Sequence, residues 1–360
     1  MLALTTDSMG SSGGIAQYNR DFIGALPGAD GDFDITILPR IGPSASASAP
    51  RIREEIPLAS RTIYSLRALM RASARFDIVF CGHLNLAALG AAVAKLSGAR
   101  FVVQTHGVEA WNCPSALTRS AVERADLVLA VSRYTRARVL SWASIPPERV
   151  VVLSNTVDDV FTPGSGGALR KAWGLEGKFI LLTAGRLSAH ERYKGHDRVV
   201  AALPALLWRH PDLVYVVIGE GDDSKRIKSL AVAAGVANRV LFKGAIAREQ
   251  LVEAYRMADL FVMPSAGEGF GIAFLEAMAC GTRAFGLACG GAVDPLCDGE
   301  IGIAVPESGF PPALEAAICA GKPDRAALAG AVHARFGRGI FQSRVRQAIS
   351  ACLEGDGPRH

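Results

Sequence analysis

Short apolar runs alternate with longer segments of helical periodicity along nearly the whole chain. The runs are rich in valine, isoleucine, leucine and phenylalanine, which is typical of buried strands. They cover residues 2–6, 33–39, 77–82, 101–106, 127–132 and 150–155 in the first half, and 179–185, 213–219, 240–244, 260–265, 283–287 and 302–305 in the second. The pattern predicts an α/β protein in which each half forms one doubly wound, Rossmann-like domain.

A segment with proline and glycine, "TPGSGG" within Asp158–Gly167, separates the two halves. We interpret it as a linker between a first domain, residues 1–160, and a second domain, residues 168–338. The last residues, 339–360, have helical spacing, and we expect this helix to pack back on the first domain. Because open parallel sheets bind ligands at the carboxyl ends of their strands, we expect the two domains to face each other across a cleft.

Composition narrows the function classes. The net charge is only +5 and no lysine-rich tail is present, so we expect no nucleic-acid partner. The seven cysteines include no Cys-x-x-Cys pair, which indicates buried free thiols. No apolar run reaches the ~18 residues of a membrane span, and the start of the chain lacks the features of a signal peptide. We therefore expect a cytoplasmic protein.

The stretch "AGEGFGIAFLEAMACG" sets two glutamates, Glu268 and Glu276, around a glycine-rich turn between a predicted strand and a predicted helix. The small residues Gly269 and Gly271 let a ligand approach the backbone, and the free amides of a helix start favour an anionic group. Glu276, about one turn into the helix, can accept hydrogen bonds from a vicinal diol. For either glutamate alone, an ordinary strand–turn–helix is the simpler alternative.

A second group of polar residues follows the strand predicted at 179–185. Arg186 ends that strand, and the loop returns Lys194 just before another helix. A guanidinium and an ammonium at a strand end can bind a diphosphate and stabilise its growing charge as it leaves, without a metal ion. We interpret the other charges of the loop as solvated: His190, Glu191, Arg192 and His196.

These residues resemble a known family, the retaining glycosyltransferases of the GT-B fold, and within it the fourth family. The resemblance rests on "AGRLSAHERYKGHD", "VIGEGDD", "VLFKGAI", "AYRMADLFVMPSAGEGFGIAFLEAMACGT" and "GIAV". It is specific from Phe179 to Val305 and weaker over the first half.

The resemblance implies a role for each matching residue. Arg186 and Lys194 would be catalytic residues that hold the donor pyrophosphate and stabilise the departing nucleoside diphosphate. Glu268 would be a catalytic residue that holds hydroxyls of the transferred sugar. The donor-binding set would also include Glu276, on the ribose, and the turn residues Gly269, Phe270, Gly271 and Ile272. The base would lie near Gly219, Lys243, Gly244 and Ile246.

Two features of the first half fit this interpretation. Gly13 and Gly14 join the first strand to a helix, where they would face the donor phosphates, although they form neither a phosphate-binding loop with a following lysine nor a full dinucleotide fingerprint. His106 ends a strand, a position that similar enzymes place near the transferred sugar. A purely structural histidine is an equal alternative. The "DGD" at Asp30–Asp32 lies in a polar turn, so we expect no metal site there.

The acceptor side is less clear in the sequence. Arg67, Arg71 and Arg75 follow one another at four-residue spacing and form one stripe of a predicted helix. Similar enzymes use a basic helix of the first domain to dock on anionic lipid, at the inner face of the membrane. A solvated face of an ordinary helix is at least as good an interpretation.

The sequence therefore predicts a retaining, metal-independent hexosyltransferase that needs no cofactor. Its partners would be a nucleoside diphosphate sugar, GDP-mannose or a UDP-sugar, and a hydroxyl of a glycan or lipid-linked acceptor. Front-face transfer is the preferred route to retention, because no carboxylate is assigned as a nucleophile. Two alternatives stay open, a sugar-nucleotide epimerase of the same fold and a transferase-like binding subunit without turnover.

Overall fold

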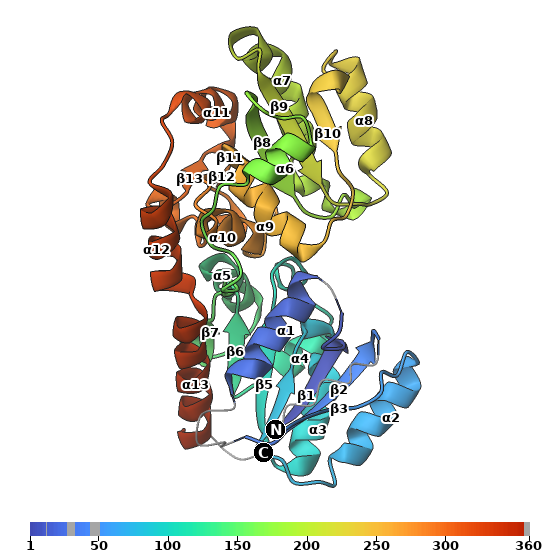
Figure 1. Cartoon of the computed structure of the whole chain (residues 1–360). Coiled ribbons are helices and arrows are strands. Elements are labelled where there is room, and N and C mark those ends of the chain that lie inside the picture. The colour runs from blue at the N-terminus through green and yellow to red at the C-terminus, as the bar shows by residue number, and fades with distance from the viewer. Residues whose placement is uncertain (12, 27–32, 44–50, 356–360) are drawn as a thin grey trace. The chain divides into compact units, whose positions relative to one another are not determined.

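The computed structural model describes residues 1–11, 13–26, 33–43 and 51–355, and its two compact units are each built on a parallel sheet (Figure 1). The first unit holds Met1–Thr156 and the chain from Gly339 onward, and the second holds Val157–Arg338. The "DGD" turn, Asp30–Asp32, lies wholly outside the described residues, and so does most of the serine-rich stretch up to Pro50.

Within the described residues, the sheet of the first unit has seven parallel strands in the order β3-β2-β1-β4-β5-β6-β7. They are β1 (Leu2–Asp7), β2 (Ile35–Ile41), β3 (Ile52–Glu54), β4 (Ile78–Cys81), β5 (Arg100–Thr105), β6 (Leu127–Ala130) and β7 (Val150–Val152). The α-helices of this unit are α1 (Gly14–Ala25), α2 (Arg61–Arg71), α3 (Ala87–Ser97), α4 (Ala116–Glu123), α5 (Arg133–Trp142) and, at the C-terminal end, α13 (Arg338–Glu354).

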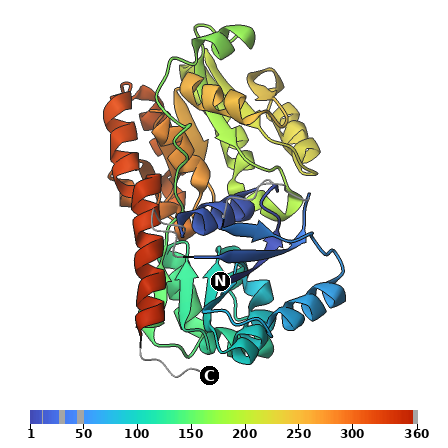
Figure 2. The same ribbon diagram turned by 60° about the horizontal axis from the view of Figure 1, so that its bottom comes forward.

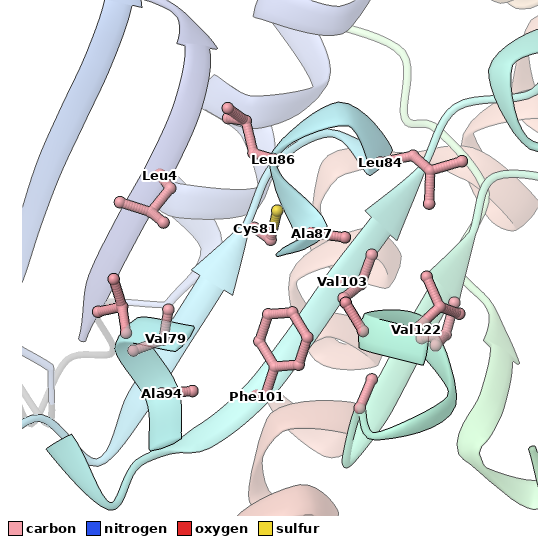
Figure 3. Close-up of a cluster of buried hydrophobic side chains, with 14 of the residues drawn as sticks. Leu4, Val79, Cys81, Leu84, Leu86, Ala87, Ala94, Phe101, Val103 and Val122 are labelled. Atoms are coloured by element: carbon pink, nitrogen blue, oxygen red, sulfur yellow. The ribbon is translucent and has the colours of Figure 1, made fainter. Parts of the chain in front are cut away.

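Alternate residues of the strands build the core of this unit. Figure 3 shows Leu4 of β1, Val79 of β4 and Phe101 of β5 with side chains of α3 and α4 beside them. A Cβ at Gly90 of α3 would lie 2.7 Å from the Phe101 ring, so the small residue lets the helix sit close to the sheet. Burial on both faces explains why these strands are continuous apolar runs rather than alternating ones.

The second unit has a six-stranded parallel sheet, as far as the described residues go, in the order β10-β9-β8-β11-β12-β13. Its strands are β8 (Phe179–Ala184), β9 (Leu213–Ile218), β10 (Val240–Phe242), β11 (Leu260–Met263), β12 (Ala284–Leu287) and β13 (Ile303–Val305). Its α-helices are α6 (Gly167–Ala172), α7 (His196–Arg209), α8 (Ser224–Ala233), α9 (Arg248–Met257), α10 (Ile272–Ala279), α11 (Phe310–Cys319) and α12 (Arg325–Phe336).

Every predicted strand is confirmed. The strand that the sequence pattern missed is β3, which is short and follows the serine-rich stretch. Several helices begin where a side-chain oxygen accepts a backbone N–H. Ser132 caps α5 through the amide of Thr135, and Asp324 caps α12 through the amide of Ala327.

The proline- and glycine-containing segment after Val157 belongs to the second unit. The Arg256 guanidinium donates hydrogen bonds to the carbonyl and the hydroxyl oxygen of Thr162, at 2.8 and 2.7 Å. The helix α13, visible along its length in Figure 2, packs in the first unit. Its Phe341 ring lies 5.9 Å from the Tyr18 ring, edge to face, and Arg346 donates to the carbonyl of Ala25 at 3.0 Å.

All seven cysteines are free thiols, as predicted. Burial was predicted for all of them, and this is wrong for Cys113, Cys289 and Cys319, which are exposed. Within the part of the chain that the structure describes, no helix is both long and apolar enough to span a membrane.

Candidate active site

The strand order of the second unit determines which loops meet. The chain runs outward from β8 through β9 to β10 and then returns to β11 on the other side of β8. The switch point between β8 and β11 is where doubly wound sheets bind ligands. The β8–α7 loop (186–195) and the β11–α10 loop (264–271) lie there side by side, and the Ala266 amide donates to the Tyr193 carbonyl at 2.8 Å.

Glycines allow the loops at this edge to touch through their backbones. Gly195 has φ +78°, and a Cβ there would lie 2.4 Å from the carbonyl oxygen of Pro264. Gly219, after β9, has φ +127°, and a Cβ there would lie 1.9 Å from the carbonyl oxygen of Gly185. A side chain at either position is incompatible with both the space and the backbone conformation.

Arg186 and Lys194, both predicted from the sequence, are brought together by a third residue, Glu191. The Glu191 carboxylate forms an ion pair with the Arg186 guanidinium through one oxygen and with the Lys194 ammonium through the other, at 2.7 Å. The Arg186 side chain is 77% exposed, whereas those of Lys194 and Glu191 are 13% and 14% exposed. The sequence interpretation of Glu191 as a solvated loop charge is therefore wrong.

One more residue of this loop, His196, differs from its predicted solvated state. Arg192 is exposed, as predicted, although it donates from Nε to the buried carboxylate of Asp223 at 3.0 Å, which ties the loop to the start of α8. The His196 side chain is buried, and its Nδ1 lies 3.2 Å from the Tyr215 hydroxyl. Burial, with a smaller effect from the charge of Lys194, lowers the pKa of His196 to about 4. His190 is exposed, as predicted.

Glu268 lies in the β11–α10 loop beside these cations. Burial raises the pKa of its carboxyl group, while the nearby charge of Lys194 opposes that shift and the charge of Glu191 adds to it. The Glu268 carbonyl also accepts a hydrogen bond from the Gly291 amide at 2.8 Å, which joins the loops after β11 and β12. Glu268 is therefore held within electrostatic reach of the Arg186–Glu191–Lys194 group.

In the turn before α10, the backbone rather than the side chains is available to a ligand. Gly271 has φ +94° and precedes Ile272, the first residue of α10. The Phe270 side chain is buried, and its ring packs edge to face against Phe336 at 5.9 Å. Phe270 can therefore contact a ligand only through its backbone, as Gly269 can.

Glu276 projects from α10 toward α9. The Tyr255 hydroxyl donates a hydrogen bond to Glu276 Oε2 at 2.8 Å. Burial raises the pKa of Glu276, and the Tyr255 hydrogen bond and the charge of Arg248 oppose that shift. The sequence reasoning did not find Tyr255, because the tyrosine looks like any other apolar-face residue of its helix.

The residues expected near the base also come together. The Gly219 amide donates to the Gly244 carbonyl at 2.8 Å, so the ends of β9 and β10 are joined. The Lys243 ammonium lies over the Trp173 ring, 4.4 Å from its centre, and Ile246 is half-buried two residues after Gly244.

The predicted residues of the first unit lie at the carboxyl edge of its own sheet. Gly13, with φ +110°, precedes α1, and Gly14 is the first residue of that helix. His106 Nε2 lies 2.9 Å from the carbonyl oxygen of Gly82, so Nε2 carries the proton and Nδ1 is an acceptor. Burial lowers the pKa of His106.

The arginine stripe of α2 is not a free basic face. Arg67 and Arg71 both form ion pairs with Glu55, whose side chain is only 3% exposed. The exposed side of the helix carries apolar residues instead, with Ile63 at 55%, Leu66 at 57% and Met70 at 75% exposure. Which face of this helix is exposed to solvent was not visible in the sequence.

Comparison with known proteins places this geometry in a family. Residues 12–161 match the model described as Glycosyltransferase Family 4, and residues 167–319 match that of Glycosyl transferases group 1. A GDP-mannose-dependent alpha-(1-6)-phosphatidylinositol monomannoside mannosyltransferase of Mycolicibacterium smegmatis is 31% identical over 98% of this chain and 97% of its own length. The chain belongs to the fourth glycosyltransferase family.

Another relative agrees with that membership, and two solved structures share the fold. A D-inositol 3-phosphate glycosyltransferase of Acidothermus cellulolyticus is 31% identical over 65% of this chain and 52% of its own. The HepE protein of Anabaena, solved with UDP, aligns with a TM-score of 0.77 at 18% identity, over 98% of this chain and 100% of its own. WaaG, a glycosyltransferase involved in lipopolysaccharide biosynthesis, aligns with a TM-score of 0.70 at 20% identity, over 99% and 100%.

These comparisons confirm the predicted family, the two-domain GT-B fold and the assignment as a glycosyltransferase. In this glycosyltransferase the Arg186–Glu191–Lys194 group, Glu268 and Glu276 lie at the carboxyl edge of one sheet, in loops that follow β8 and β11 and in the helix after β11. Their individual roles stay predictions.

Proposed function

We propose that this glycosyltransferase transfers a hexose from a nucleoside diphosphate sugar to a hydroxyl of a glycan or glycolipid, with retention and without a metal ion. The observation that carries the proposal is the cation pair beside Glu268. Lys194 is nearly excluded from water, and charges in such a setting interact more strongly than in water. Arg186 and Lys194 can therefore stabilise the departing diphosphate, which is the work that a divalent ion does in other transferases.

The donor of first choice is GDP-mannose. The relative that matches nearly the whole chain bears GDP-mannose in its name, at 31% identity. The HepE structures contain UDP or UDP-glucose, at 18% identity. Since the relationship to the mannosyltransferase is the stronger one, we propose GDP-mannose first and a UDP-sugar second.

The two glutamates divide the donor between them in this proposal. Glu268, beside the cation pair, takes hydroxyls of the transferred sugar, and Glu276, on α10, takes the ribose diol. Titration calorimetry with GDP and with GDP-mannose tests the division. Glu276→Gln should weaken the binding of both ligands, whereas Glu268→Gln should leave GDP binding nearly unchanged and lower turnover. Equal losses of GDP affinity in the two variants would contradict it.

We propose that His106 contacts the transferred sugar. Its Nε2 donates to the Gly82 carbonyl, so its Nδ1 can accept a hydrogen bond from a sugar hydroxyl. Because GDP lacks the sugar, His106→Ala should reduce turnover and leave GDP affinity unchanged. For the transfer itself we propose a front-face route, in which the leaving phosphate helps to take the acceptor proton and no carboxylate nucleophile is required.

The outer face of α2 supports a peripheral membrane contact. Ile63, Leu66 and Met70 expose more than half of their surface, and Ile56, shortly before the helix, is 70% exposed. Contiguous exposed apolar residues are unusual on a monomer and favour a lipid interface. The variant Leu66→Glu/Met70→Glu should lose sedimentation with phosphatidylglycerol vesicles, and Thr62→Glu, on the same helix, is the matched control for added charge.

The central experiment incubates the purified protein with labelled GDP-mannose, or UDP-glucose, and a phosphatidylinositol monomannoside acceptor. The proposal expects a glycolipid product whose new linkage keeps the α configuration of the donor, as read by nuclear magnetic resonance. A change of the sugar nucleotide without acceptor would indicate an epimerase. Donor binding without any product across a panel of acceptors would indicate a binding subunit. Either result would overturn the proposal.

A further inference from the structure

Tyr255 lies directly behind Glu276 and has no assigned role. The tyrosine belongs to α9 and is fully buried, and its hydroxyl donates to Glu276 Oε2 at 2.8 Å. The two residues are 21 positions apart and come from different helices. Burial, with the neighbouring charge of Glu276, raises the pKa of Tyr255 well above its ordinary value, so the hydroxyl keeps its proton and acts as a donor.

The surroundings of Tyr255 leave its ring a single position. Phe161 and Phe261 pack edge to face against it, with ring centres 5.9 and 5.7 Å away. The Tyr255 carbonyl accepts a hydrogen bond from the Thr282 hydroxyl at 2.6 Å, which holds the end of α9 to the segment after α10. The hydroxyl is therefore presented to α10 by a rigid aromatic group.

This hydrogen bond has two effects on Glu276. It engages Oε2 and so restrains the rotamer of the carboxylate. It also opposes the rise in the pKa of Glu276 that burial causes, and so favours the ionised form. A carboxylate that must accept hydroxyl groups needs both a defined orientation and a negative charge.

We infer that Tyr255 is a positioning residue for the nucleotide: it keeps Glu276 ionised and oriented for the ribose diol. The inference rests on the proposed function of Glu276 as the ribose ligand. A purely structural role for Tyr255, in which its hydroxyl only satisfies a buried acid, makes a different prediction. It would lower the stability of the protein and leave nucleotide affinity unchanged.

The test is Tyr255→Phe in the full chain, with GDP and UDP as titrants in calorimetry. We expect the affinity for the nucleotide that binds the wild type to fall roughly tenfold, because the charged acceptor loses one hydrogen bond. Tyr215→Phe is the matched control. It removes another fully buried hydroxyl of the same unit, which donates to Thr183 at 2.8 Å, and should leave affinity unchanged even if the melting temperature falls.

Two further measurements separate positioning from structure. The affinity should weaken as pH falls and Glu276 takes up a proton, and in Tyr255→Phe this weakening should begin at a higher pH, because the bond that lowers the pKa is gone. The 2′,3′-dideoxy form of the same nucleotide, which lacks the diol, should bind the wild type and Tyr255→Phe equally.

Glu276→Gln distinguishes the possible failures. If this variant loses nucleotide affinity and Tyr255→Phe does not, the inference about Tyr255 is wrong and the proposed ribose contact stands. If Glu276→Gln also binds like the wild type, the ribose contact itself is wrong and the inference falls with it. An unshifted pH profile in Tyr255→Phe, together with a lower melting temperature, would establish the structural role instead.

Discussion

Lys194→Ala is the substitution that tests the proposed chemistry most directly. The Lys194 side chain is 13% exposed and its ammonium lies 2.7 Å from Glu191, so it is already desolvated and held in place. The attraction between such an ammonium and a unit negative charge about 4 Å away is roughly 4 kcal/mol at an effective dielectric constant of about 20. Only the charge that develops as the diphosphate leaves counts toward catalysis, so the expected loss is ~2.7–4 kcal/mol, or about 10²–10³-fold in kcat.

Arg186 should matter less than its charge suggests. Its side chain is 77% exposed, and in water the same charge at the same distance contributes about 1 kcal/mol, further reduced by salt. Arg186→Ala should therefore lower kcat roughly tenfold or less, since a factor of ten corresponds to ~1.4 kcal/mol. The structure thus predicts an order between two cations that the sequence treated as equivalent.

The assay is transfer from saturating GDP-mannose, or from UDP-glucose if that is the donor used, with kcat read from product formation. Lys178→Ala is the matched control. That lysine forms an ion pair of the same 2.7 Å length with Asp212, and it precedes β8, at the opposite end of the strand from Arg186. Near-normal kcat in Lys194→Ala, or a larger loss in Arg186→Ala than in Lys194→Ala, would refute the reasoning from burial.

Chelation with EDTA followed by dialysis should leave transfer intact, because the two cations take the place of a metal, and a strict need for added magnesium or manganese would contradict this. Glu268→Gln should raise the melting temperature near neutral pH while lowering turnover, since burial raises the pKa of Glu268 and the ionised form opposes folding above that pKa. The gain should disappear in acid, where wild-type Glu268 is protonated, and equal shifts at both pH values would speak against the assignment. Gly219→Ala should destabilise the protein by about 3 kcal/mol, because its φ is positive and its Cβ would meet the Gly185 carbonyl at 1.9 Å. The control is Gly235→Ala, where φ is also positive and a Cβ meets nothing within 4 Å among the described residues, and chemical denaturation compares the two.

The amino-acid pattern was enough to predict the sheets. A parallel strand is buried on both faces, so it appears as a continuous apolar run, and all the predicted runs became strands. The pattern also placed Arg186, Lys194 and Glu268 after strands of one half. Since the carboxyl ends of parallel strands share one edge, their proximity followed from the sequence once a doubly wound order was assumed. The strand β3 was not predicted, because three residues are too few to show a strand pattern.

Partners that are distant along the chain, or that depend on which face of a helix is buried, were decided only by the tertiary structure. Tyr255 meets Glu276 because α9 and α10 pack together, and no local pattern records that hydrogen bond. The periodicity of α2 showed an arginine stripe, but a buried acid outside the helix, Glu55, forms ion pairs with Arg67 and Arg71, and apolar residues of the same helix are exposed. Glu191 likewise looked like any loop charge until folding brought both of its oxygens to cations. The burial of apolar residues can be predicted from the local sequence, because each residue contributes its own apolar surface. The state of a charged or hydrogen-bonding group depends instead on a partner that only the folded chain supplies.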